Sequence, residues 1–295
     1  MNTLEEPGLP LRAALAGIAL VLAATFSFAL GDVSTKYLAG RYPVEVILAV
    51  RYALNTALLL AFVYPKLGAR LWATNRVWLV IGRGGCLALA SLTLALALRL
   101  MPVGETIAII YLSPFVVMLL SAPFLGEPVR RGNWIWAALG FAGVLIIVRP
   151  GGGLDAFGVT LALINAGLAT AYHLLTRLLS RTETTISLLF HTAWVGTVVF
   201  GLWAAPSLSG LAIAAFDLVV MLGLGVAYSL GHYLFTAAYR AAPPSLLAPV
   251  NYAHLVWAGG LGFLFFGDVP GVFSLAGMGL ICVSGVAIAL SARRK

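Results

Sequence analysis

Four polar or aromatic side chains stand close together in one apolar stretch near the end of the chain: Asn251, Tyr252, His254 and Trp257. Asn251, His254 and Trp257 follow one another at intervals of three residues, so in a helix all three would share one face. Their amide, imidazole and indole groups form hydrogen bonds, and histidine also titrates near neutral pH. The pattern predicts a face that binds a small solute, with hydrogen bonding between helices as the alternative.

Other apolar stretches carry similar residues. Tyr228 and His232 are four residues apart, which places them on one helix face. Tyr111 and Ser113 stand in the middle of an apolar run in the first half of the chain. We expect these four side chains to line the same cavity as His254.

Arg83 and two prolines complete the candidate site. Arg83 lies inside an apolar stretch, where it either extends to the cytoplasmic surface or offers a forked donor to a substrate carboxylate. Pro114 and Pro249 each remove a backbone hydrogen bond, so each is expected to kink its helix and to serve in gating.

The sequence contains no pattern that indicates catalysis. It has no glycine-rich phosphate loop and no His/Cys cluster with metal-ligand spacing, so we expect no cofactor and no metal. Ser113 and His254 lack any surrounding motif of a nucleophile and its base. Cys86 and Cys282 both lie in apolar stretches, and nothing supports a disulfide between them.

The composition indicates that these stretches cross a lipid bilayer. The chain is 61% hydrophobic and 9% charged, against about 25% charged in an ordinary soluble domain. The net charge of +8 comes from basic residues scattered at the ends of apolar stretches, which argues against nucleic-acid binding. We therefore expect an integral membrane protein with short loops.

Ten apolar runs have about the length that a membrane-spanning helix needs. They cover residues 12–34, 44–64, 77–98, 103–122, 134–148, 157–179, 185–204, 212–239, 245–266 and 271–291. The prediction is an all-α membrane protein of ten transmembrane helices. A glycine-rich linker at residues 151–153 separates a first five-helix unit, residues 1–150, from a second, residues 151–295.

The two units contain the same landmarks in the same register. Three residues of the first unit have an equivalent of the same type 141 positions later (240−99, 243−102, 252−111). The pairs are Arg99 and Arg240, Pro102 and Pro243, and Tyr111 and Tyr252. Such a register over most of a half-chain indicates duplication. Because five spans per repeat is an odd number, the second repeat must enter the membrane from the opposite side, which is the inverted repeat of many secondary transporters.

The Lys/Arg bias sets the expected orientation. Most basic residues at span ends fall on the side of the two termini, and only a few fall on the other side: Lys36, Arg41, Arg51, Arg99 and Arg149. Cytoplasmic loops carry the excess of positive charge. Both termini are therefore expected in the cytoplasm.

Each unit closes its fourth span with an apolar run followed by glycine and an acid, Phe-Leu-Gly-Glu at 124–127 and Phe-Phe-Gly-Asp at 265–268. With the duplicated five-helix halves, this resembles the EamA-type drug/metabolite transporters over about residues 17–290. The stretch from Pro249 through Tyr252 and Trp257 to Asp268 resembles the amino-acid exporter branch. Asp268 departs from the glutamate that the family more often has there, which weakens an equivalent role for the two acids.

The resemblance implies a secondary transporter in a bacterial cytoplasmic membrane that exports small metabolites. Neutral or aromatic amino acids are the first candidate substrates, and hydrophobic drugs, other metabolites or an intramembrane enzyme are the alternatives. We expect a monomer or a weak dimer with a small-molecule substrate as its partner. No soluble partner is expected, because the loops offer little docking surface.

Coupling remains open between proton exchange at His254 and uniport. Asp32 and Glu105 are expected to pair with Lys36 or Arg99 near the outer ends of their spans. With no carboxylate near His254 to share a proton, uniport is the favoured alternative.

Overall fold

The computed structural model describes residues 11–125, 131–149, 151 and 153–291, and every regular element among them is a helix. The first half contains α1 (Leu11–Ala39), α2 (Val44–Phe62), α3 (Tyr64–Leu67), η1 (Gly68–Leu71), α4 (Val77–Leu100), α5 (Val103–Ile110), α6 (Leu112–Leu125) and α7 (Arg131–Val148). The second half contains α8 (Ala156–Leu179), α9 (Thr185–Ala204), η2 (Pro206–Leu208), α10 (Ala215–Ala241), α11 (Pro244–Leu247), η3 (Ala248–Tyr252), α12 (Ala253–Phe266) and α13 (Val272–Ser291). The predicted all-α class is confirmed for the described residues.

Eight of the described helical segments are long and apolar enough to cross a membrane: α1, α2, α4, α5 with α6, α8, α9, α10 and α13. A shorter apolar helix covers residues 132–148, and α12 has 14 residues. The chain is therefore a multi-pass membrane protein, as its composition predicted.

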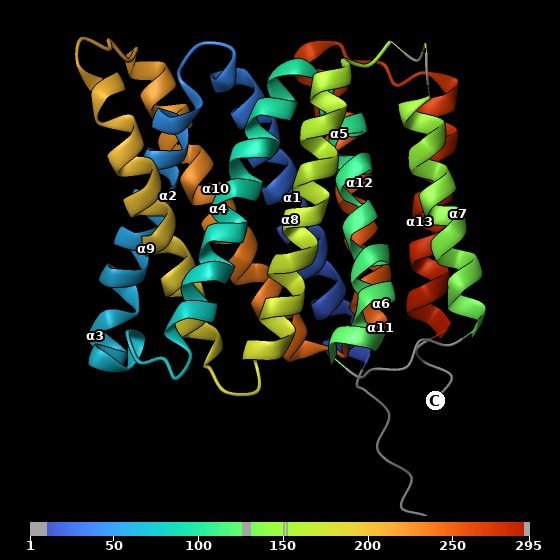
Figure 1. Ribbon diagram of the computed structural model, residues 1–295, viewed down its shortest axis with the longest axis horizontal. Coiled ribbons are helices and arrows are strands. Elements are labelled where there is room, and N and C mark those ends of the chain that lie inside the picture. The colour runs from blue at the N-terminus through green and yellow to red at the C-terminus, as the bar shows by residue number, and fades with distance from the viewer. Residues whose placement is uncertain (1–10, 126–130, 150, 152, 292–295) are drawn as a thin grey trace, which may run out of the picture.

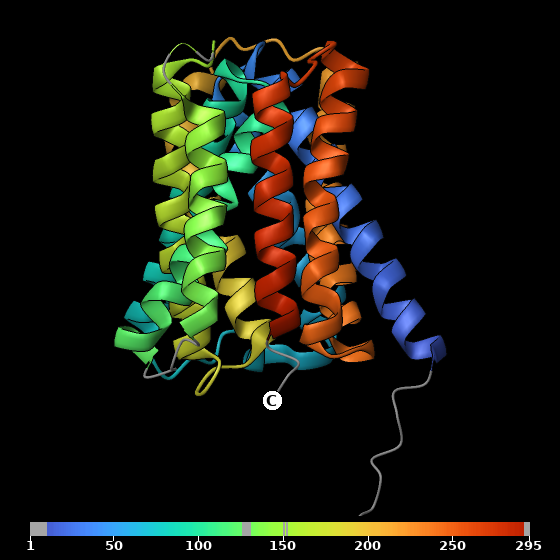
Figure 2. The ribbon, with the colours of Figure 1, turned by 90° about the vertical axis from the view of Figure 1, so that its right-hand side faces the viewer.

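The long helices stand side by side in one bundle (Figure 1). The first half packs against the second along its length: α1 lies along α10, α2 along α9, α4 along α8, and α7 along α13. Figure 2 shows that α1 begins and α13 ends at the same end of the bundle. A polar group that reaches the interior of this bundle is consequently placed between the two halves of the chain.

Two of the predicted spans, 103–122 and 245–266, are not continuous helices. α5 ends at Ile110 and α6 begins at Leu112, so Tyr111 marks the first interruption. In the second half, α11 ends at Leu247, η3 follows it and ends at Tyr252, and α12 begins at Ala253.

The prolines explain where these interruptions fall. Pro114 lies in the first turn of α6 and Pro249 lies in η3. Inside a helix, a proline lacks the N–H for an intrahelical hydrogen bond and clashes with the carbonyl four residues earlier. In the first turn of a helix no such bond is made and no helical carbonyl stands in that place, so proline is tolerated there. A gating role for the two prolines stays a prediction.

Glycines permit one close helix contact. A Cβ atom added to Gly143 of α7 would lie 2.8 Å from the carbonyl oxygen of Gly277 in α13, so any larger residue would push the two helices apart. Gly151 and Gly153 have φ angles of 76° and 80°, which suits the predicted linker. Gly152 and the predicted Gly126-Glu127 landmark lie outside the described residues.

Candidate functional site

A buried polar cluster joins α1, α10 and α12. The Nε2 atom of His254 lies 2.9 Å from Oδ2 of Asp32, and the Tyr228 hydroxyl donates a hydrogen bond of 2.6 Å to Oδ1 of the same carboxylate. Asp32 is 2% exposed and Tyr228 is 6% exposed. We call these three residues the Asp32 cluster. It combines a carboxylate, an imidazole and a phenol, which together can bind a polar group and hold a proton.

The cluster corrects two expectations from the sequence. Asp32 does not pair with Lys36, because the ammonium group of Lys36 instead donates 2.7 Å to Oδ2 of Asp268 and 3.0 Å to the carbonyl of Met101. The expectation that no carboxylate lies near His254 is also wrong. The reason is tertiary: α1 packs against both α10 and α12, which bring Tyr228 and His254 to Asp32.

Aromatic rings surround the Asp32 cluster. The ring of Phe28 in α1 lies 5.0 Å from that of His232 and 6.3 Å from that of His254. The ring centroid of Tyr111 lies 6.0 Å from that of His254. Of the predicted site residues, Tyr111 therefore lies beside His254, and His232 lies beside Phe28, which also contacts His254.

The two interrupted helices meet at their breaks. The Tyr111 and Tyr252 rings are 5.2 Å apart, and the Tyr111 hydroxyl donates a hydrogen bond of 2.9 Å to the carbonyl of Asn251. These two tyrosines come from opposite halves of the chain. The backbone irregularities of both halves therefore lie at one place inside the bundle.

His254 and Trp257 both lie in α12, three residues apart, so they share a helix face as the spacing predicted. Asn251 does not belong to that face, because it lies in η3 and α12 begins only at Ala253. The Asn251 amide nitrogen donates 3.1 Å to the hydroxyl of Tyr239, and the Trp257 ring packs edge-on against Phe26. Both residues nevertheless keep a buried polar atom, Oδ1 of Asn251 and Nε1 of Trp257, with no partner among the described groups. Such atoms are rare inside folded proteins and suit contact with a polar solute or water.

Ser113 and Arg83 make their hydrogen bonds elsewhere. Ser113 is 3% exposed and accepts a bond from Thr170. Arg83 is also 3% exposed, so the alternative that it extends to the surface is wrong. Its guanidinium donates to four oxygens, on Thr176, Tyr172, Thr192 and the backbone of Leu188. A role for either residue in substrate binding stays a prediction.

Arg51 was not among the expected site residues, because it was assigned to the basic residues on the side of the membrane opposite to the two termini. It is only 6% exposed, and its guanidinium carbon lies 3.7 Å from the ring centroid of Tyr228. Its Nε atom is buried without a hydrogen-bond partner. The signal that could have identified both Arg51 and Asp32 is an ionisable residue inside a membrane-spanning run, which usually faces the interior of a bundle.

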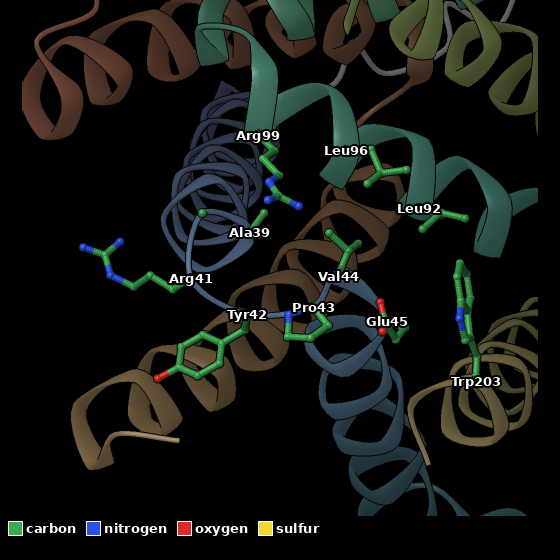
Figure 3. A pocket seen from close by; sticks show the side chains of 11 residues that line it. Ala39, Arg41, Tyr42, Pro43, Val44, Glu45, Leu92, Leu96, Arg99 and Trp203 are labelled. Atoms are coloured by element: carbon green, nitrogen blue, oxygen red, sulfur yellow. The ribbon is translucent and has the colours of Figure 1, made fainter. Parts of the chain in front are cut away.

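A cleft of about 520 Å³ lies beside the connection between α1 and α2 (Figure 3). Figure 1 shows this connection at the end of the bundle opposite to the end of α13. Its lining comes from the α1–α2 connection, the last turns of α4, and α9, and it includes Arg41, Val44, Glu45, Arg99 and Trp203. Figure 3 shows the guanidinium groups of Arg41 and Arg99 on the same side of Val44. The cleft lining thus contains two arginines and one acid, Glu45.

No group of three or more His, Cys, Asp or Glu side chains that could hold a metal ion occurs among the described residues. The cluster around His254 has one histidine and one carboxylate in contact, which is fewer ligands than a zinc site uses.

Several known transporters resemble this chain over most of its length. The chain is 28% identical to a pseudopaline exporter of Pseudomonas aeruginosa over 92% of this chain and 95% of that protein. It is 28% identical to a riboflavin transporter of Rhizobium johnstonii (97% and 94% covered) and 25% identical to an S-adenosylmethionine uptake transporter of Rickettsia felis (96% and 96%).

A solved crystal structure with 21% sequence identity matches the fold with a TM-score of 0.67, covering 96% of this chain and 99% of that one. Residues 15–149, which contain Asp32, Arg51 and Tyr111, match the EamA-like transporter family. The EamA-type resemblance expected from the sequence is thereby confirmed over residues 15–149 of this multi-pass membrane protein.

Proposed function

We propose that this protein is a secondary transporter that exports small metabolites, with neutral or aromatic amino acids as its first candidate substrates. The observation that carries the proposal is the Asp32 cluster, in which Asp32 of the first half contacts Tyr228 and His254 of the second. A site shared by two halves changes its access when the halves rock against each other, which is how alternating access operates.

We propose further that the chain crosses the membrane ten times as two inverted repeats. α7 supplies one of the two additional crossings, and α11, η3 and α12 together supply the other. Helix interruptions at Tyr111 and Tyr252, 141 residues apart (252−111), support the repeat.

A second contact supports the same symmetry. Oγ1 of Thr56 lies 2.8 Å from Oγ1 of Thr197, and the two residues are again 141 positions apart. A two-fold axis brings a residue next to its own equivalent in the other unit. Tyr111 against Tyr252 and Thr56 against Thr197 are two such contacts.

The orientation proposed is that of both termini in the cytoplasm of a bacterial cell. The basic residues that follow α2 and α8, Lys66, Arg70 and Arg181, support it because they lie on the side of the termini. A monomer or weak dimer in the cytoplasmic membrane is the assembly that we propose.

Amino acids are favoured because the site offers polar groups for the charged ends of a zwitterion and aromatic surface for its apolar side chain. Asp32 and His254 are the polar groups, while Phe28, Tyr111 and Trp257 provide aromatic surface. The relatives carry riboflavin, S-adenosylmethionine or pseudopaline by name. Export of a different metabolite is therefore the second candidate.

The contact between Asp32 and His254 favours proton exchange over uniport. A carboxylate and an imidazole at hydrogen-bond distance share a proton, and a solute that binds to either group changes where that proton resides. This reverses the preference that the sequence indicated.

The test is flux in proteoliposomes that contain the purified protein. Amino acids, riboflavin and S-adenosylmethionine are compared with and without an imposed pH gradient. Flux of neutral amino acids that rises with the gradient supports the whole proposal. Movement of riboflavin or S-adenosylmethionine alone would show that the amino-acid assignment is wrong.

A further inference from the structure

Two arginines are buried in the bundle in similar surroundings, and only one has its hydrogen bonds satisfied. Arg83 lies over the ring of Tyr172 at 4.3 Å, and Arg51 lies over the ring of Tyr228 at 3.7 Å. Both are less than a tenth exposed. The guanidinium of Arg83 donates to four protein oxygens, whereas Arg51 has no hydrogen bond or ion pair with any described residue.

The carboxylates nearest to Arg51 in the chain and in its packing partners are bound to other groups. Asp32 is held by Tyr228 and His254. Glu45, six residues before Arg51, accepts a hydrogen bond from Ser207. Asp217, at the start of α10, accepts bonds from Tyr37 and Tyr42. Arg51 is thus a buried cation without a counter-ion among the described residues.

A buried cation that lacks a partner is strongly unfavourable, and contact with an aromatic ring offsets only part of this. The flat face of the Arg51 guanidinium is covered by Tyr228, which leaves its edges for hydrogen bonds. Those edges match the two oxygens of a carboxylate in geometry and in charge. A single guanidinium suits one negative charge better than it suits the two charges of a phosphate monoester.

The cleft and this arginine share helix α2. Val44 lines the cleft and lies two helical turns before Arg51 on the same face of α2, about 10 Å away along the axis. Arg41 and Arg99 in the cleft lining add positive charge that attracts an anion (Figure 3). Tyr228 then stands between Arg51, which it covers, and Asp32, to which it donates.

We propose that Arg51 binds the carboxylate of the transported solute. This inference rests on the proposed transport function and restricts its substrate class to solutes that carry a carboxylate. The ammonium group of an amino acid would then lie towards Asp32, on the hydroxyl side of Tyr228. Tyr228 sets the distance between the two charged ends.

The first test is binding, which does not depend on transport. Benzoate, benzamide and phenyl phosphate are added to the purified protein, and unfolding is followed with a dye that reacts with Cys86 and Cys282 as they become exposed. Benzoate should raise the midpoint of unfolding by about 2–4 °C, and the other two should not. Arg51→Gln should abolish the shift, and Arg51→Lys should weaken it while keeping the preference for benzoate. Arg70→Gln, an exposed arginine in η1, is the matched control that should keep the full shift.

The second test is transport of phenylalanine against its amide. At equal concentrations, wild-type protein should transport phenylalanine about 10- to 100-fold faster than phenylalanine amide. Arg51→Gln should reduce this ratio of fluxes to about one. If Arg51→Gln does not fold, Arg51→Lys gives the same comparison with a smaller change.

The outcomes separate the two proposals. An equal benzoate shift in wild type and Arg51→Gln, or a larger shift with phenyl phosphate, overturns the role of Arg51 while leaving transport standing. A benzoate shift that depends on Arg51, in a protein that moves no amino acid, supports the carboxylate site and refutes amino-acid export.

Discussion

His254 Nε2 and Asp32 Oδ2 lie 2.9 Å apart although 222 residues separate them in the chain. One residue belongs to the first half of the protein and the other to the second, so the contact forms only when the two halves are packed together. Tyr228 holds the second oxygen of the same carboxylate. Any movement of one half against the other must therefore change the surroundings of Asp32.

Replacing Asp32 with Asn tests the charge of this carboxylate. The variant keeps the size of the side chain and an oxygen for the Tyr228 hydroxyl, but it removes the negative charge beside His254. We expect flux driven by a pH gradient to fall at least about tenfold, while exchange of solute for solute continues. Flux in proteoliposomes measures both.

Asp155→Asn is the matched control for this change. Asp155 caps α8 through a hydrogen bond from the backbone of Gly158, and asparagine caps a helix equally well. Its flux should equal that of wild type. An Asp32→Asn protein that still responds fully to the gradient would exclude proton exchange at this residue.

His254→Gln tests the other side of the contact. Glutamine forms hydrogen bonds but does not titrate near pH 7, so a proton exchanger should lose gradient-driven flux and retain exchange. His191→Gln serves as the comparison, since His191 is buried against the backbone of Ser187. Normal transport by His254→Gln, together with flux that ignores the gradient, would leave uniport as the mechanism.

The proposed topology is tested by two serines that flank α9. Ser180 and Ser209 are both exposed and lie before and after this helix. In a background in which Cys86 and Cys282 are alanine, Ser180→Cys should react with an impermeant thiol reagent only from the cytoplasmic side. Ser209→Cys should react only from outside. Labelling of both from one side would refute the crossing of α9.

The ion pair between Lys36 and Asp268 should stabilise the contact between α1 and the end of α12. Its two side chains are 17% and 24% exposed, so it is screened less than a surface pair. We expect Lys36→Met and Asp268→Asn each to lower the midpoint of thermal unfolding. We expect the charge exchange, Lys36→Asp with Asp268→Lys, to recover most of the loss.

A double-mutant cycle on this pair should give a coupling of about 1 kcal/mol, of the size measured for residues in contact. Additive effects of the two single changes would show that the pair contributes no stability of its own. Lys66→Met, at an exposed position, provides the comparison for loss of a lysine.

The sequence by itself determined the membrane character, the helices and their approximate ends. The predicted spans 44–64 and 185–204 correspond to α2 (Val44–Phe62) and α9 (Thr185–Ala204), because apolar length and polar flanks set these boundaries locally. It also indicated His254, Tyr111 and Tyr228 as candidate site residues, because a polar or aromatic side chain inside a span is informative wherever its helix packs. Their role in binding stays a prediction.

Only the tertiary structure decided which side chains meet. These helices are apolar on all sides, so periodicity does not reveal which face of a span points inward. Lys36 lies one helical turn from Asp32 and is its nearest basic residue in the sequence. In the structure, Asp32 instead contacts His254 of α12 and Tyr228 of α10. Lys36 forms its ion pair with Asp268. The position of Arg51 on the ring of Tyr228 has the same origin. Partners that lie on different helices are set by how the helices rotate and pack, and this information is not local in the sequence.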